Sequence, residues 1–169
     1  MKKQTIAVCP GSFDPVTVGH LDIIRRACGM FDRVIVVVMQ NKYNKAPPMF
    51  TAYERKEMIL RCIVDIENAE VDSYDGLLAD YAHMKGAAAI VKGLRAVSDF
   101  EYEFQMALTN KKLNRQAETV FLTTSAENMY LSSSIVRMVG SMGGDISDFV
   151  PECIKPDIER RLTEKGAGK

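Results

Sequence analysis

The first candidate site is a loop rich in glycine and proline that leads into a predicted helix. Residues 9–20 read CPGSFDPVTVGH. Glycines in this loop would let the backbone approach a ligand, and His20 falls in the first helical turn, where unpaired N–H groups and the helix dipole favour an anion. The spacing is neither GxGxxG nor GxxxxGK[ST], which excludes a dinucleotide fingerprint and a P-loop. By itself the loop could equally be an ordinary turn before a helix.

Two later loops carry the same kind of chemistry. Lys92 and Arg95 flank Gly93, a cationic pattern suited to phosphate. The serine run 132–134 precedes an apolar helical pattern, so its hydroxyls and free amides would form a second anion site. A serine run alone is more often a helix cap. Three such loops in one chain favour binding of a phosphorylated ligand.

The elements that must position these loops alternate along the chain. Strand patterns, with Val/Ile runs typical of buried parallel strands, lie at 5–9, 33–39, 69–73, 87–91 and 119–122. Helical patterns lie at 19–30, 51–64, 76–84, 98–113, 132–141 and 156–163, with capping boxes predicted at Thr51/Glu54 and Ser98/Glu101.

This alternation predicts an α/β fold: a single-domain, Rossmann-like, doubly wound parallel five-stranded sheet with helices on both faces. The domain would span residues 1–165, with 166–169 as a frayed tail. In such sheets the ligand lies outside the carboxyl ends of the strands, which is where all three candidate loops fall.

Composition excludes several classes of protein. The 169 residues carry 22 Lys+Arg and 22 Asp+Glu, so the net charge of zero argues against nucleic-acid binding through bulk charge. The longest clearly apolar run, 34–39, is far shorter than the roughly 20 residues of a membrane span. Four cysteines without CxxC spacing indicate reduced thiols in a cytoplasmic protein rather than a disulfide framework or zinc site.

Three segments together resemble one known family. Residues 10–20 are similar to the PG[ST]FDPxTxGH opening of the phosphopantetheine adenylyltransferases, which belong to the nucleotidyltransferases with an HxGH or TxGH motif. Residues 92–103 resemble that family's [RK]GLRxxxDFEYE segment, and residues 130–137 its ISS[ST]xVR signature. The likeness extends from about residue 6 to residue 151, and the last two segments are more specific than TxGH.

The resemblance implies an enzyme that transfers the adenylyl group of ATP to 4′-phosphopantetheine, giving 3′-dephospho-coenzyme A and pyrophosphate. It further implies Mg²⁺ bound mainly through ATP phosphates, without a dedicated protein metal site, and a homohexamer built as a dimer of trimers.

The resemblance also implies roles for individual residues. Catalytic roles fall on His20, Lys45 and Ser12. Acceptor-substrate contacts fall on Ser12, Lys45, Leu78 and Lys92. ATP contacts fall on Ser12, Phe13, His20, Gly93, Leu94, Arg95, Glu103, Asn128, Met129, Tyr130, Leu131, Ser132, Ser133 and Ser134.

Two positions depart from the family pattern. An apparent insertion separates Asn41 from Phe50, so the register of the catalytic lysine is open between Lys45, the preferred choice, and Lys42. Lys92 stands where many members have arginine, and lysine lacks the bidentate geometry of a guanidinium.

The expected chemistry needs no covalent intermediate, because the acceptor phosphate can attack the α-phosphorus directly while the protein positions two anions and stabilises charge. Asp14 is expected to bind local backbone amides rather than metal, and His83 to lie on the surface. Phe100, Phe104 and Ala107 are expected in a core or a subunit interface, and Phe104 and Met106 could approach the pantetheine arm. The apolar residues of the helix from Ser98 cover more than one face, which favours a homo-oligomer.

Two other functions remain open from the residues. One is a nucleotidyltransferase with the same opening motif that acts on a mononucleotide or another phosphorylated acceptor. The other is a nucleotide-binding protein without catalysis, which the presence of His20 beside basic loops disfavours.

Overall fold

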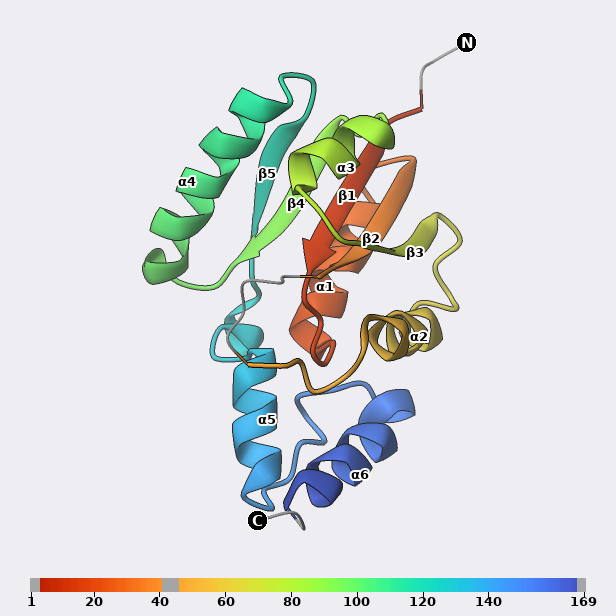
Figure 1. Ribbon diagram of the computed structural model, residues 1–169, viewed down its shortest axis with the longest axis vertical. Helices are drawn as coiled ribbons and strands as arrows, with labels where there is room; N and C mark the ends of the chain where they lie inside the picture. The colour runs from red at the N-terminus through yellow and green to blue at the C-terminus, as the bar shows by residue number, and fades with distance from the viewer. Residues whose placement is uncertain (1–3, 41–45, 167–169) are drawn as a thin grey trace.

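The computed structural model describes residues 4–40 and 46–166, and this part of the chain forms one parallel sheet with helices on both sides (Figure 1). The strands are β1 (Ile6–Gly11), β2 (Arg33–Met39), β3 (Ala69–Tyr74), β4 (Ala89–Leu94) and β5 (Glu118–Thr123). They pair in the order β3-β2-β1-β4-β5. The chain therefore moves outward from β1 to one edge and then returns to build the other, which creates a switch point between β1 and β4.

The helices divide between the two faces because successive strand residues point to opposite sides. Ala7, Cys9 and Val36 share a core with α1 (Val18–Cys28), α2 (Ala52–Cys62), α5 (Ser133–Ser141) and α6 (Lys155–Gly166). Val8 and Ile35 face the opposite side, where they pack with α3 (Leu78–Met84). The long helix α4 (Val97–Leu113) lies at the outer margin beside β5. The predicted doubly wound α/β fold is confirmed.

β4 differs from its predicted position. The sequence pattern placed the strand at 87–91, whereas the structure places it at Ala89–Leu94. The amide of Ala87 donates to the Ala82 carbonyl, so this residue completes the end of α3 instead of joining the sheet. Lys92 and Gly93 then pair in register with Phe121 and Leu122. The basic segment thus begins inside a strand, which gives it a rigid backbone.

The starts of α2 and α4 separate a correct capping prediction from a wrong one. At α2, Thr51 accepts from the Glu54 amide and the Glu54 side chain accepts from the Thr51 amide, as predicted. The box predicted at Ser98/Glu101 is wrong, since α4 begins at Val97 with Ala96 as its N-cap and no side-chain cap. The sequence pattern marked Ser98 as a cap, but that residue lies inside the helix.

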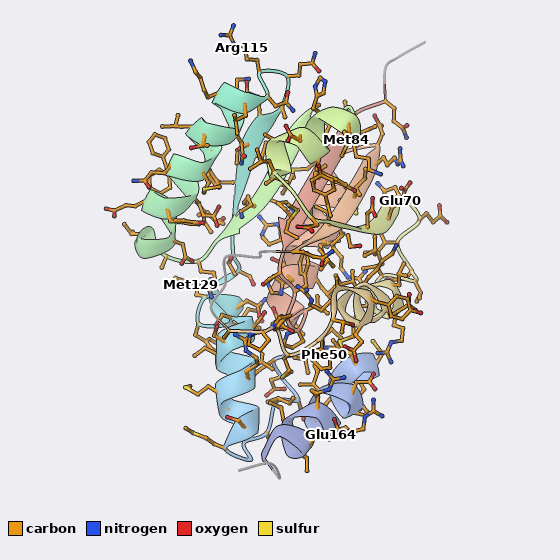
Figure 2. All side chains as sticks on the ribbon, in the orientation of Figure 1. Phe50, Glu70, Met84, Arg115, Met129 and Glu164 are labelled. Atoms are coloured by element: carbon orange, nitrogen blue, oxygen red, sulfur yellow. The ribbon has the colours of Figure 1, made fainter. Side chains whose placement is uncertain are left out.

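The C-terminal segment lies beyond the carboxyl ends of the strands, at the lower end of the molecule in Figure 1. Pro156 lies in the first turn of α6, as predicted, and the helix extends to Gly166, beyond the expected end at 163. Arg161 donates to the Met49 carbonyl and lies over the Phe50 ring, 4.7 Å from its centroid. Phe50 is labelled in Figure 2, between α2 and α6. α6 therefore supports the segment that follows residue 45. In the described residues, no helix has the length and apolar character needed to cross a membrane.

Candidate active site

A cleft of about 390 Å³ opens at the carboxyl ends of β1 and β4, between the first turns of α1 and α5. The three loops singled out by the sequence meet here. Predicted site residues that line the cleft are Ser12, Phe13, His20, Lys92, Gly93, Arg95, Glu103, Asn128, Leu131, Ser132, Ser133 and Ser134.

The first loop is shaped by a contact between Gly11 and the ring of Phe13. A Cβ on Gly11 would lie 2.8 Å from that ring, so a side chain there would displace it. Phe13 itself has a positive φ of 48°, an uncommon conformation for a bulky residue, and it is almost fully buried. Its ring meets the His20 ring edge-to-face, with centroids 5.1 Å apart. Gly11 lines the cleft, as expected for a glycine near a ligand, and it also makes room for the Phe13 ring.

His20 is held in one orientation and one tautomer. The backbone amide of Thr17 donates to its Nδ1 at 3.0 Å, which leaves Nε2 to carry the proton. Thr17 is also the N-cap of α1 and accepts from the His20 amide, so the pair forms a reciprocal capping box. Burial, together with the positive charge of Arg95, lowers the pKa of His20 to about 4. At neutral pH the imidazole is thus an uncharged Nε2–H donor at the cleft.

Asp14 anchors this loop to the chain that precedes α2. Its carboxylate accepts from the amides of Met49 and Phe50, at 2.8 and 2.9 Å. Backbone amides were predicted as its partners, but local ones; the observed amides lie 35 and 36 residues further along the chain. The carboxylate therefore links two segments, and the sequence could not place that contact.

Two arginines hold the loop carbonyls. The buried Arg55 of α2 donates to the Ser12 carbonyl at 2.6 Å, and Arg137 of α5 donates to the Asp14 carbonyl. Burial lowers the pKa of Arg55, an effect that the charge of Asp14 opposes. Because both carbonyls point to cations, the loop is held by the packed helices behind it.

Two helix N-termini present amides to the cleft. In α1, the Val18 amide donates to the Phe149 carbonyl and the His20 amide to Thr17, so Gly19 is the first-turn amide left for a ligand among the described contacts. In α5, the Ser132 hydroxyl accepts from Ile135, which leaves the amides of residues 133 and 134 at the start of the helix. These amides and the helix dipoles suit an anion with several oxygens.

The opposite wall, from β4 and α4, carries paired charges. Lys92 Nζ lies 3.0 Å from the Glu103 carboxylate. Arg95 lies 3.1 Å from Asp99 and also donates to the Leu131 carbonyl at 3.0 Å. With Arg137, the lining contains three cations and two carboxylates, so the described cleft has a small positive excess.

A second, smaller cavity of about 70 Å³ adjoins the same wall. Lys92 and Glu103 line both cavities. The smaller one also contains Leu78 and Met106, predicted near the pantetheine arm, and the sequence did not anticipate Tyr102 there.

Some predicted residues lie elsewhere. Leu94, Met129 and Tyr130 are absent from the described lining of the cleft, and Met129 and Tyr130 are 52% and 58% exposed. Tyr130 packs edge-to-face on Phe149. Lys42 and Lys45 lie outside the described residues.

The sequence analysis also assigned no role to four lining residues with hydroxyl or charged side chains: Thr17, Asp99, Thr124 and Arg137. Asp99 could have been found from its position one helical turn after Arg95. Arg137 could have been found from its position one turn after Ser134, whose hydroxyl it contacts at 3.1 Å. The expected surface position of His83 is confirmed.

Comparisons with known proteins show the family to which this chain belongs. The family model described as Cytidylyltransferase-like matches residues 8–139. Curated relatives named phosphopantetheine adenylyltransferase include one from Alkaliphilus metalliredigens, 58% identical over 92% of this chain and 98% of the relative. Another, from Caldanaerobacter subterraneus subsp. tengcongensis, is 52% identical over 95% of this chain and 96% of the relative.

A solved structure, Plasmodium falciparum nicotinic acid mononucleotide adenylyltransferase complexed with NaAD, aligns with a TM-score of 0.63 at 14% identity, over 96% of each chain. That likeness concerns the fold alone. Fold, cleft and matched family model define the class: this chain belongs to the cytidylyltransferase-like family of nucleotidyltransferases. Within that class, it belongs to the phosphopantetheine adenylyltransferase family.

Proposed function

We propose that the protein transfers the adenylyl group of ATP to 4′-phosphopantetheine, forming 3′-dephospho-coenzyme A and pyrophosphate. Family membership supports the reaction. The structural observation that carries it is the neutral, oriented His20 between two helix N-termini that face one cleft. This arrangement suits a triphosphate whose α-phosphorus lies beside the imidazole.

The reaction proceeds by direct in-line attack. A phosphate oxygen of the acceptor forms a bond to the α-phosphorus, and the bond to the β-phosphate breaks, so its electron pair leaves with pyrophosphate. His20 donates its Nε2 proton in a hydrogen bond to an α-phosphate oxygen as charge builds there. Since the imidazole is neutral, it stabilises this charge without transferring a proton.

The remaining residues position the two substrates. Arg95 and the start of α5, including Ser133, hold the outer phosphates of ATP, while Ser12 approaches the reacting phosphates. The adenosine occupies the part of the cleft bounded by Gly93, Asn128 and Leu131, and Lys45 is retained as the catalytic lysine after β2. Holding the two anions together in this way accounts for most of the catalysis.

The acceptor arrives from the smaller cavity. Its arm packs on Leu78 and Met106, and its phosphate binds Lys92, the residue common to both cavities. For this to happen Lys92 must exchange its carboxylate partner Glu103 for the phosphate. Glu103 is then available to the ATP side, as the family resemblance implies.

Mg²⁺ would enter with ATP. The described residues contain no group of three or more His, Cys, Asp or Glu side chains arranged to hold a metal, and both carboxylates of the cleft pair with cations. This donor set fits an ion coordinated by triphosphate oxygens and water, as Mg²⁺ prefers. When bound, Mg²⁺ supplies neutralisation of the phosphate charge.

Release of pyrophosphate from ATP tests the reaction. We expect release with 4′-phosphopantetheine and none above background with nicotinate mononucleotide. The same assay is applied to His20→Ala, which should release much less pyrophosphate. His83→Ala is its control, because His83 is an exposed histidine outside the cleft. Release only with nicotinate mononucleotide would contradict the proposed acceptor and favour a mononucleotide. No release with either acceptor would contradict the proposed reaction and favour a nucleotide-binding protein without catalysis.

We also propose that the protein is a homo-oligomer, a hexamer of two stacked trimers, working in the cytoplasm. On α4, Tyr102, Phe104 and Leu108 are 64%, 46% and 57% exposed, so this helix keeps an uncovered apolar surface. Phe104 is therefore not in the core of the chain. Light scattering during size exclusion at micromolar protein should give about six times the 18.9 kDa chain mass. A mass of one chain would refute the proposal.

A further inference from the structure

Two cysteines that are far apart in the sequence meet at the surface. Cys62 ends α2 and Cys153 lies in the short 3₁₀ helix Glu152–Ile154, yet their sulfur atoms are 3.6 Å apart. They are 91 residues apart in the chain. Neither lines the described cleft or takes part in the proposed mechanism.

The contact is held by neighbours on both sides. Ile59, one helical turn before Cys62, and Ile154, next to Cys153 in the chain, are fully buried and share one core. Arg61 donates to the Cys153 carbonyl at 3.2 Å and to the Asp157 carboxylate at 2.5 Å. These interactions fix both backbones. The sulfur atoms, now 3.6 Å apart, need to approach by only about 1.5 Å to reach the length of a disulfide bond.

The two thiols differ in access. Cys153 is exposed, whereas Cys62 is buried. Burial, with a smaller contribution from Cys153, raises the pKa of Cys62 to about 12, although the nearby Arg61 and Arg25 oppose the rise. A reagent from solution therefore meets Cys153 first, and Cys62 can react only with a sulfur already placed beside it.

We propose that Cys62 and Cys153 form a reversible disulfide by exchange with a low-molecular-weight disulfide. In the first step the Cys153 thiolate attacks one sulfur of RSSR, forming Cys153–S–SR and releasing RS⁻. In the second, Cys62 loses its proton to solvent and attacks Cys153 Sγ, releasing the second RS⁻. The protein loses two electrons and two protons, and RSSR is reduced to two RSH.

The bond would join the end of α2 to the turn before α6. These elements also hold the first loop, since Arg55 of α2 binds the Ser12 carbonyl and Arg161 of α6 binds the Met49 carbonyl. Cross-linking over so long a loop restricts the unfolded chain. We expect oxidation to raise Tm by about 5–10 °C, a change that dithiothreitol reverses.

The test measures free thiols in the full-length protein with oxidised glutathione as the probe. Alkylation followed by intact mass should show four reactive thiols in the reduced, unfolded protein and two after oxidation, with no glutathione retained. Peptide mapping should identify a Cys62–Cys153 link within one chain. Retention of both thiols, a stable glutathione adduct on wild type, or a link between two chains would overturn the proposal.

Three variants separate the steps. Cys62→Ser should trap glutathione on Cys153, whereas Cys153→Ser should take up none and keep normal adenylyl transfer. Cys28→Ser is the matched control, because it removes another thiol and should still form the bond. Loss of the bond in Cys28→Ser would assign the chemistry to a different pair. Should Cys62→Ser fold poorly, the exposed Cys153→Ser still decides the proposal.

Discussion

The two walls of the cleft are built on different principles. The β1–α1 wall is organised before any ligand arrives, since His20 is oriented by Thr17 and the loop carbonyls are held by Arg55 and Arg137. The β4–α4 wall instead holds its cations on carboxylates, with Lys92 on Glu103 and Arg95 on Asp99. In the proposed mechanism, the first wall supplies fixed donors for the reacting phosphate. The second wall would supply charges that exchange partners when substrates bind.

The sharpest test of the fixed wall is His20→Ala. Loss of one preorganised donor should lower kcat by about 10²–10³, while ATP affinity changes little, because the contact strengthens in the transition state. Steady-state kinetics and a separate ATP titration measure the two effects. Near-normal kcat would show that the oriented imidazole does not serve catalysis; His83→Ala controls for loss of a histidine.

The proposed mechanism also assigns catalysis to a lysine that follows β2 in the sequence. Lys45→Ala should lower kcat by about 10², more than Lys42→Ala, because Lys45 is nearer the Pro-Phe landmark after the family's lysine. Parallel kinetics of the two variants measure the difference. An inactive Lys42→Ala beside a normal Lys45→Ala would reverse the assignment.

Asp14→Asn tests whether the fixed wall depends on its anchor. The amide group would place a second donor against the Met49 or Phe50 N–H, leaving one buried donor without an acceptor. We expect a loss of about 2–3 kcal/mol in the free energy of unfolding by denaturant titration. Asp65→Asn, an exposed carboxylate paired with Arg25, is the matched control. Equal stability of both variants would argue against the anchoring role.

The pH dependence of the free energy of unfolding tests the neutral state of His20 in the β1–α1 wall. The pKa of His20 is lowered from 6.5 to about 4, so between these values the unfolded chain binds a proton that the folded chain does not. Stability should therefore fall as pH drops through this window, by up to about 3 kcal/mol from His20, because each unit of pKa shift corresponds to about 1.4 kcal/mol. His20→Gln should show a shallower fall in denaturant titrations from pH 7 to 4. Parallel curves for wild type and variant would contradict the lowered pKa.

The smallest expected effect tests the exchanging wall. Glu103→Gln removes the partner that Lys92 must leave, so the KM for 4′-phosphopantetheine should fall, while weaker ATP contacts raise the KM for ATP, each by about threefold. Both changes correspond to less than about 1 kcal/mol. Initial rates with each substrate varied measure the split. An unchanged pair of KM values would mean that the ion pair does not open during binding.

Patterns within a few residues of the chain could be predicted from the sequence, whereas the exact limits of helices and strands could not. The Thr51/Glu54 box was correct because it is local: cap and partner lie three residues apart on one turn. The Ser98/Glu101 box shows the same spacing, but the chain enters helical geometry earlier, after Ala96. At β4, the Ala87 amide bonds to the end of α3, so the strand begins later than predicted and includes Lys92 and Gly93. Local patterns identified each element, and neighbouring contacts set its limits.

By itself, the sequence determined the alternation of strands and helices and the edge where the loops meet, because periodicity and helix-start chemistry act over a few residues. Most of the predicted cleft lining came from the family resemblance. Only the tertiary structure decided which distant groups touch. It placed the Asp14 carboxylate on the Met49 and Phe50 amides and Cys62 beside Cys153. Such contacts depend on how packed elements lie in space, which no spacing along the chain encodes.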